Sequence, residues 1–159
     1  MAALEVDVQL ACDAPDIPPQ ADVRSWVEAA IEHSGVASGD AIEVAVRIVD
    51  SDEIRTLNRL YRKQDKPTNV LSFPAGEIAG MPDMASRLLG DVVICAAVVA
   101  AEAAEQGKSP ADHWGHMLVH GTLHLLGFDH QTGAEAAEME ALEARILATK
   151  SVTDPYKGS

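Results

Sequence analysis

The stretch LLGDVVICAAVVAAEAAEQG, residues 88–107, decides which class of fold the chain adopts. Its first part, LLGDVVICA, is an almost unbroken apolar run, which is typical of a strand buried on both faces. Its second part, AAVVAAEAAEQG, is expected to be a helix that ends at Gly107, because glycine readily terminates helices. The stretch therefore predicts a strand inside a sheet, followed by a helix that packs on the sheet.

The segments around this stretch alternate between strand and helix patterns early in the chain and are mostly helical later. Further strands are predicted at 4–10, 41–49 and 69–73. Further helices are predicted at 20–34, 51–62, 110–126 and 134–148. Residues 75–87 are expected to form a loop, and 150–159 a loose tail. This order predicts a single α+β domain over residues 1–159, in which a small mixed sheet of about four strands packs with about five α-helices.

Length and composition place the chain among globular proteins. Its 159 residues suit one compact domain, and 47% apolar with 23% charged residues excludes fibrous and disordered classes. The N-terminus does not resemble a signal peptide, and the longest uncharged apolar run, 92–101, is too short to span a bilayer. Cys12 and Cys95, both expected in strands, fit buried reduced thiols, with a disulfide as the alternative. We therefore expect a cytoplasmic protein with no membrane partner.

Charge is unevenly distributed along the chain. The net charge is -13, yet five basic residues fall between positions 55 and 66, where Asp65 is the only acid, so this basic window carries a local +4. The five are Arg55, Arg59, Arg62, Lys63 and Lys66. The apolar residues of the helix predicted here are expected to face inward, namely Ile54, Leu57 and either Leu60 or Tyr61. Such a window can meet a phosphate, or it can simply be a solvated helix face.

The densest group of potential metal ligands is HGTLHLLGFDH, residues 120–130. With two earlier histidines it makes a row on one helical face: His113, His116, His120 and His124. His120 and His124 lie one turn apart and can direct two imidazoles at one ion, and a left-handed turn at Gly127 can bring His130 back over the same face. The pattern H-x-x-x-H-x-x-G-x-x-H predicts one Zn²⁺ held by His120, His124 and His130, with a fourth position left for water.

The same spacing occurs in metzincin peptidases, where a glutamate after the first histidine acts as general base. Here that position is Gly121, so the carboxylate needed for peptide hydrolysis is missing. A zinc ion by itself can still lower the pKa of water to about 7. Asp129 is the nearest candidate carboxylate, and it either orients an imidazole or caps the turn. These residues favour a hydrolytic metal site that is not a peptidase site.

Three segments resemble the YbeY family of bacterial metal-dependent endoribonucleases: LNRLYRKQDKPTNVLSFP at 57–74, LGDVVICAAVVAAEAA at 89–104 and VHGTLHLLGFDH at 119–130. The resemblance implies an α+β fold, a zinc ion on the same three histidines, and cleavage of single-stranded RNA. It also implies a role in ribosomal RNA processing, at the 3′ end of the small-subunit 16S RNA, and in ribosome quality control. Ribosomal RNA and the ribosome or its small subunit are therefore the expected partners.

The resemblance also implies roles for single residues. Arg62 matches an arginine linked to activity in the family, and a guanidinium can hold two phosphoryl oxygens of a transition state. His116 is the second catalytic candidate: it lines the cleft or donates to a phosphate, or it is a packed histidine. His113 is expected at the surface. The residues expected to shape the pocket are Thr68, Asn69 and Ser72.

Two other functions stay open on the sequence alone. The metal could be structural, in a non-catalytic ribosome-assembly factor whose basic helix binds RNA. The protein could also hydrolyse a peptide or an ester, although Gly121 counts against a peptidase.

Overall fold

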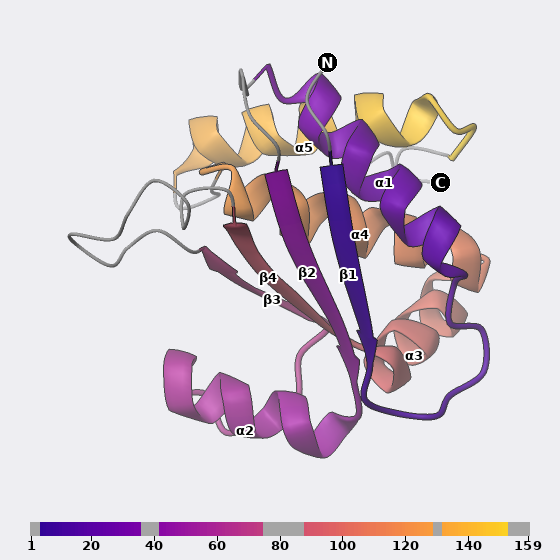
Figure 1. Ribbon diagram of the computed structural model, residues 1–159, viewed down its shortest axis with the longest axis vertical. Helices are drawn as coiled ribbons and strands as arrows, with labels where there is room; N and C mark the ends of the chain where they lie inside the picture. Colours follow the sequence, from indigo (N-terminus) through magenta and orange to yellow (C-terminus); the bar gives the residue numbers. More distant parts are fainter. Residues whose placement is uncertain (1–3, 36–41, 75–87, 129–131, 153–159) are drawn as a thin grey trace.

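The computed structural model of the chain describes residues 4–35, 42–74, 88–128 and 132–152 (Figure 1). The elements within these ranges are β1 (Leu4–Leu10), α1 (Gln20–His33), β2 (Ile42–Val49), α2 (Ser51–Arg62), β3 (Val70–Pro74), β4 (Leu88–Cys95), α3 (Ala96–Gln106), α4 (Pro110–Leu125) and α5 (Gly133–Ala148). The predicted α+β class is confirmed, with four strands and five helices in the described ranges. The expected loop at 75–87 and most of the expected tail, from 153 onward, lie outside the described residues.

The four strands form one mixed sheet in the order β1-β2-β4-β3. β1, β2 and β4 are parallel, with Val6 opposite Val44 and Val46 opposite Val92. β3 runs antiparallel to β4, with Ser72 opposite Val92, and forms one edge of the sheet. Parallel neighbours need a crossover, and α1 supplies it between β1 and β2.

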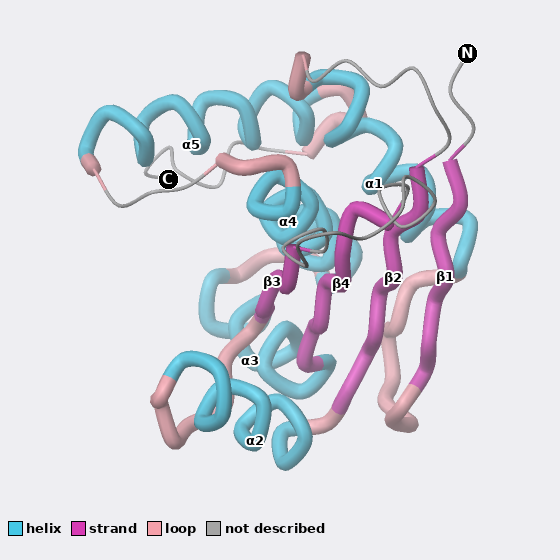
Figure 2. Tube along the Cα trace, turned by 60° about the vertical axis from the view of Figure 1, so that its left-hand side comes forward, coloured by secondary structure: helices cyan, strands magenta, loops and turns pink. Residues whose placement is uncertain are grey.

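The strand β4 is buried on both faces, as its apolar run predicts. Val92 and Ile94 belong to the main core, with residues of α1 and α4. Val93 and Cys95 belong to a second cluster that includes Ile54 of α2. Successive strand residues face opposite sides of a sheet, so α2 covers one face while α1 and α4 cover the other. Figure 2 shows α4 lying between the sheet and α5.

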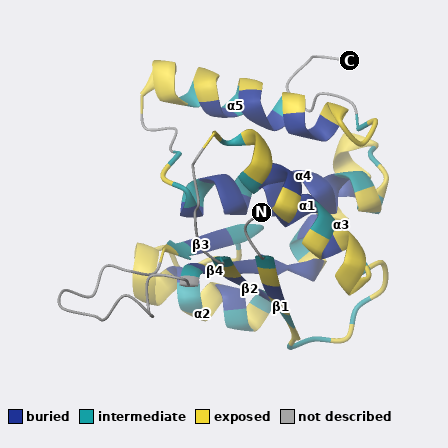
Figure 3. Cartoon of the chain, turned by 45° about the horizontal axis from the view of Figure 1, so that its top comes forward, coloured by how far each residue is buried: buried dark blue, intermediate teal, exposed yellow. Residues whose placement is uncertain are grey.

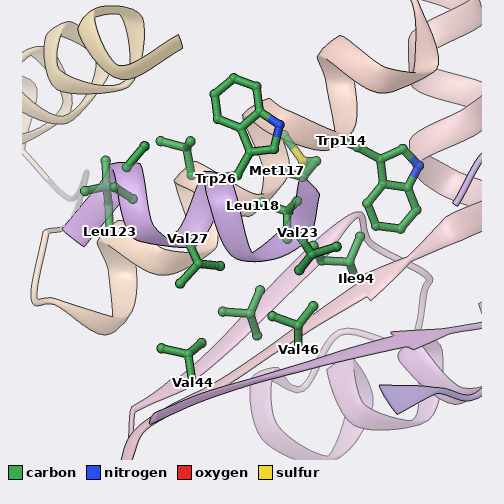
Figure 4. Packing of buried hydrophobic residues seen from close by; sticks show 14 of the residues in the cluster. Val23, Trp26, Val27, Val44, Val46, Ile94, Trp114, Met117, Leu118 and Leu123 are labelled. Carbon is green, nitrogen blue, oxygen red and sulfur yellow. The ribbon is translucent and has the colours of Figure 1, made fainter. Parts of the chain in front are cut away.

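The helix α4 is central to the main core (Figure 4). Its Trp114 and Leu118 are fully buried, and they pack with Val23 of α1 and the apolar residues of the sheet. Gly115 brings α1 close, because a Cβ atom there would lie 2.5 Å from the indole of Trp26. The helix α5 packs on α4 with one face and leaves the other exposed (Figure 3). The core therefore holds α4 rigidly between the sheet and an outer helix.

The C-terminal end of α2 differs from the prediction. Leu60 and Tyr61 are 63% and 65% exposed, so the expectation that one of them faces inward is wrong. The buried positions are Ile54 and Asn58. Asn58 continues the buried stripe because its side chain donates a hydrogen bond at 2.9 Å to the carbonyl of Lys66, which folds the following loop over it.

The two cysteines are both free thiols in the structure. Cys95 is buried at the end of β4, as expected, whereas Cys12 lies beyond the end of β1 and is only half-buried. The prediction of a strand at Cys12 is wrong, because the ladder with β2 stops at Leu10. None of the helices in the described ranges is both long and apolar enough to cross a membrane.

Candidate active site

The helix α4 begins and ends at clear signals in its sequence. Ser109 caps its N-terminus with a side-chain hydrogen bond, and Pro110 follows at a position that tolerates its missing N–H. At the other end Gly127 adopts a φ of 101°, and the N–H of Phe128 donates to the carbonyl of Leu123 at 3.0 Å. A left-handed glycine suits this kind of helix end, so the predicted stop at Gly127 is confirmed.

His120 and His124 face each other one turn apart on α4. Their Nε2 atoms are 3.1 Å apart. Two imidazole nitrogens that bind the same tetrahedral zinc ion, each at about 2.0–2.1 Å, lie roughly 3.4 Å from each other. On the other side of the His120 ring, Nδ1 donates a hydrogen bond to Oε1 of Glu143 at 3.3 Å. In the neutral ring this leaves the lone pair on Nε2, directed toward His124.

Glu143 is a buried carboxylate of α5 that serves two histidines. Its side chain is 1% exposed, and besides the bond from His120 it accepts one from Nε2 of His116 at 2.7 Å. Burial favours the neutral acid, but the hydrogen bonds from His116 and His120 outweigh it and lower the pKa of Glu143 to about 2. Glu143 is therefore ionised at neutral pH. Zinc-ligating imidazoles in proteins are commonly oriented by an ionised carboxylate of this kind.

The expected third ligand, His130, and the candidate carboxylate Asp129 lie outside the described residues. Among the residues that are described, no three His, Cys, Asp or Glu side chains are grouped to hold a metal ion. The donors that are described fit zinc, because two imidazole nitrogens converge and a buried carboxylate orients one of the rings. The structure brings His120 and His124 together, and their role as ligands stays a prediction.

Gly121, which occupies the place of the peptidase glutamate, packs against the sheet. A Cβ atom here would lie 2.6 Å from Cγ1 of Val92 and 3.1 Å from Cγ2 of Val70. The hydroxyl of Ser72 donates a hydrogen bond to the carbonyl of Gly121 at 2.9 Å. There is no room for a side chain at this position. The close approach of α4 to β3 and β4 therefore requires glycine here and excludes a glutamate.

His113, expected at the surface, is 2% exposed, so that expectation is wrong. α3 packs against this end of α4 and supplies Glu102, whose Oε1 accepts a hydrogen bond from Nε2 of His113 at 2.8 Å. Burial lowers the pKa of His113, and the bond to Glu102 only partly opposes this. In the neutral ring Nδ1 is an acceptor, and Nζ of Lys108 lies 3.5 Å from it.

His116 is also buried, at 8% exposure. Its Nε2 donates to Oε2 of Glu143, whereas His120 donates to Oε1 of the same carboxylate. Of the two alternatives for this residue, the geometry favours a packed histidine over a direct contact with phosphate.

One cavity of about 990 Å³ connects the histidine pair with the basic window. His120 and His124 line it together with Arg62 and Lys66. Arg62 is exposed and is the last residue of α2, and Lys66 is held by the Asn58 hydrogen bond. Arg62 at the end of α2 and Lys66 in the following loop therefore share a cleft with two imidazoles from α4, although these segments are far apart in the sequence.

The rest of the basic window lies elsewhere. Arg55 forms two hydrogen bonds with Asp65, at 2.9 and 3.2 Å, and this guanidinium lowers the pKa of that exposed carboxyl. Arg55 and Arg59 line a separate pocket with Asp65. Of the five residues in the window, Arg62 and Lys66 line the histidine cleft, Arg55 and Arg59 line the separate pocket, and Lys63, the C-cap of α2, is in the lining of neither.

The three polar residues expected to shape the pocket all line the cleft: Thr68, Asn69 and Ser72. Asn69 begins β3 by accepting a hydrogen bond from the N–H of Val70 at 2.7 Å. Its Nδ2 lies 3.1 and 3.2 Å from the two oxygens of Glu102. The amide therefore ties the rim of the cleft to α3.

Glu143 and Glu102, which hold the histidines, are absent from the residues selected on sequence. Glu143 belongs to an acidic run, 135–143, which is typical of a solvated helix face. Its spacing carries the missed signal: it lies four residues after Met139 and three before Ile146, both buried. An acidic residue within the apolar stripe of a helix must be paired, so this position predicts a buried partner.

Fold and site together define the class of the protein: a small α+β protein whose central helix presents paired imidazoles to an arginine-flanked cleft. Residues 10–151 match the family described as Endoribonuclease YbeY. The chain is 55% identical over 157 residues to Endoribonuclease YbeY of Halorhodospira halophila, covering 99% of both chains. It is 50% identical over 153 residues to Endoribonuclease YbeY of Alcanivorax borkumensis, covering 95% of this chain and 85% of the relative. The chain belongs to the YbeY endoribonuclease family.

The fold is also shared with a solved structure. The solution structure of a protein from Thermotoga maritima superposes with a TM-score of 0.50 at 21% identity, covering 95% of this chain and 99% of that one. At this identity the likeness concerns the fold alone. The family resemblance seen in the sequence is confirmed by the family match and the relatives.

Proposed function

We propose that the protein is a zinc-dependent endoribonuclease that cleaves single-stranded RNA in the cytoplasm. Its task is ribosomal RNA processing, at the 3′ end of 16S RNA, together with ribosome quality control. One observation carries the proposal: His120, His124 and Arg62 line a single cavity. Family membership supports the choice of RNA as substrate.

The residues that would hold one zinc ion are His120, His124 and His130. When bound, zinc would supply a Lewis acid and lower the pKa of a water molecule to about 7. Glu143 fixes the ring of His120 through its bond to Nδ1, so that the lone pair of Nε2 is oriented toward His124 and the ion that the two rings would share. His116 acts through Glu143 rather than on the substrate, which makes it a positioning residue in this proposal.

Arg62 is the group that meets the substrate. Cleavage of a phosphodiester adds negative charge to the phosphoryl oxygens, and a planar guanidinium can hold two of them at once. Lys66 lines the same cavity and can bind the next phosphate of the strand. A cavity of about 990 Å³ accommodates a few unpaired nucleotides, whereas a duplex would first have to open.

The test is cleavage of ribosomal RNA by purified protein, with both ends of the products mapped. His120→Ala and Arg62→Ala should each abolish cleavage, and Arg62→Lys should restore only part of it, because an ammonium cannot bind two oxygens in a fixed plane. Arg59→Ala is the matched control: it removes the same charge from the same helix, outside the cleft, and should leave the rate near wild type. Full activity of Arg62→Ala would refute the proposal.

A second candidate is a non-catalytic assembly factor that binds RNA through its basic helix. The observation in its favour is that Arg59 is exposed outside the histidine cleft. Charge reversal at Arg59 that releases the protein from ribosomes, with no cleavage by the wild type, would favour this candidate over the nuclease.

A further inference from the structure

A second cavity adjoins the histidine cleft. Its volume is about 320 Å³, and Asn69 and His120 line both cavities. Ligand pockets in proteins begin at about 300 Å³, so one nucleotide fits here. An RNA strand bound across His120 can therefore continue from the main cleft into this second cavity.

The wall of the second cavity holds a carboxylate in a fixed orientation. Glu102 accepts a hydrogen bond from Nε2 of His113 at 2.8 Å and others from Nδ2 of Asn69 at 3.1 and 3.2 Å. Its side chain is still 28% exposed. A carboxylate has roughly four acceptor sites, so capacity remains for a donor from a ligand. Asn69 and His113 both donate to Glu102, so its carboxylate is ionised and can only accept a hydrogen bond from a ligand in the cavity.

Lys108 lines the same cavity, next to His113. Its positive charge offsets the repulsion that Glu102 would otherwise exert on a phosphate backbone. The cavity thus combines an acceptor of fixed direction with a cation. A site for phosphate alone would need only the cation, whereas an oriented acceptor suits the amino edge of a nucleobase.

We infer that the second cavity is a nucleobase subsite in which Glu102 accepts a hydrogen bond from an exocyclic amino group of the RNA. The inference rests on the proposed nuclease function and adds a base preference to it. Cytosine offers an amino group at the position where uracil has a carbonyl oxygen. Uracil would place one acceptor against another, so the subsite selects cytosine over uracil among pyrimidines.

The test is a comparison of oligocytidine and oligouridine, both six nucleotides long and 2′-O-methylated, in fluorescence anisotropy. Wild-type protein should bind oligocytidine roughly tenfold more tightly, since one well-placed base contact discriminates by that order. Glu102→Gln should bring the ratio close to one, because the amide can also donate to the uracil carbonyl. Glu105→Gln, an exposed position on the same helix, is the matched control and should keep the ratio.

A second ligand tests the contact without altering the protein. Oligonucleotides of N4,N4-dimethylcytidine lack the amino hydrogens and should bind wild type no better than oligouridine. Equal binding of the cytidine and uridine strands, a preference that survives in Glu102→Gln, or no binding of either strand would overturn the subsite. Cleavage without base preference would leave the nuclease proposal standing while removing the subsite, and preference without cleavage would do the reverse.

Discussion

Three histidines of α4 each donate a hydrogen bond to a buried or half-buried glutamate: His113 to Glu102, and His116 and His120 to Glu143. A carboxylate on one imidazole nitrogen fixes which nitrogen carries the proton and raises the basicity of the other. At the scale of single residues, the glutamates therefore decide what each histidine can do. In the proposed zinc site Glu143 orients His120 toward the ion, while Glu102 holds His113 in place.

Glu143→Gln tests this arrangement. The amide keeps the size of the side chain but removes the charge that orients His120, so zinc affinity should fall by about 10–100-fold. Competition with a chromophoric chelator measures the affinity, and Glu138→Gln, exposed on the same helix, is the control. A zinc affinity within twofold of wild type would show that Glu143 has no part in orienting the ligand.

The burial of His113 should make the stability of the protein depend on pH. Burial holds its pKa below the ordinary 6.5, so the unfolded chain takes up a proton that the folded protein resists. The free energy of unfolding of metal-free protein should fall as the pH drops from about 7.5 to about 5.5, and it should fall less in His113→Asn. Glu143 does not interfere, because its stabilising effect is lost only below its ordinary pKa of 4.5, toward about 2.

Urea unfolding at the two pH values measures this difference. The groups that face His113 are Glu102, Lys108 and His116, and they are present in both proteins. Equal slopes for wild type and His113→Asn would show that His113 takes up its proton as readily in the folded protein as in the unfolded chain.

At the scale of elements, the contact between α4 and the strands β3 and β4 sets the site. Gly121 makes this contact possible because it has no side chain, and the hydrogen bond from Ser72 to the carbonyl of Gly121 stabilises it. The same contact puts the histidines of α4 beside β3, whose residues form one wall of the cleft. The loop after α2 forms another wall of the cleft. Lys66 of this loop is held in place by the hydrogen bond that its carbonyl accepts from Asn58.

Gly121→Ala should destabilise the protein by about 1–3 kcal/mol, because the new methyl group overlaps Val92 and forces α4 away from the sheet. Urea unfolding gives the free energy, and zinc affinity should fall with it as His120 moves. Gly133→Ala is the control, since a Cβ atom there meets nothing within 4 Å. An unchanged free energy of unfolding in Gly121→Ala would mean that the contact is looser than the structure shows.

At the scale of the whole molecule, the strong negative charge of the chain is compatible with an RNA substrate because the basic residues are concentrated. Of the twelve Lys and Arg residues, Arg62 and Lys66 stand at the cleft, and Lys108 stands in the cavity beside it. Net charge governs long-range steering, whereas contact with a phosphate depends on the local field. The metal would add further positive charge at the same place.

Zinc should also stabilise the whole fold, because its expected ligands come together only in the folded chain. At about 100 times its dissociation constant a ligand adds roughly 2.7 kcal/mol. For a domain of this size that raises Tm by about 5–10 °C. Differential scanning calorimetry with and without zinc measures the shift, which His120→Ala should remove. A shift that persists in this variant would place the zinc elsewhere.

The sequence by itself determined the elements of this protein. β1, α3 and the ends of α4 follow from alternation, helical spacing and the stop signals at Gly107 and Gly127, which act within a few residues. The histidine row and the family motifs are equally local, so the pair His120 and His124 was recognisable in advance. The order of the patterns also predicted the mixed sheet.

Only the tertiary structure decided which side chains the histidines meet. Glu143 is 23 residues from His120, and Glu102 is 11 residues from His113, so no local spacing joins them. Packing also buried His113, left Tyr61 exposed and joined Arg62 to the histidine cleft. The physical reason is that secondary structure depends on neighbours along the chain, whereas burial and charge pairing depend on which faces of distant elements come into contact.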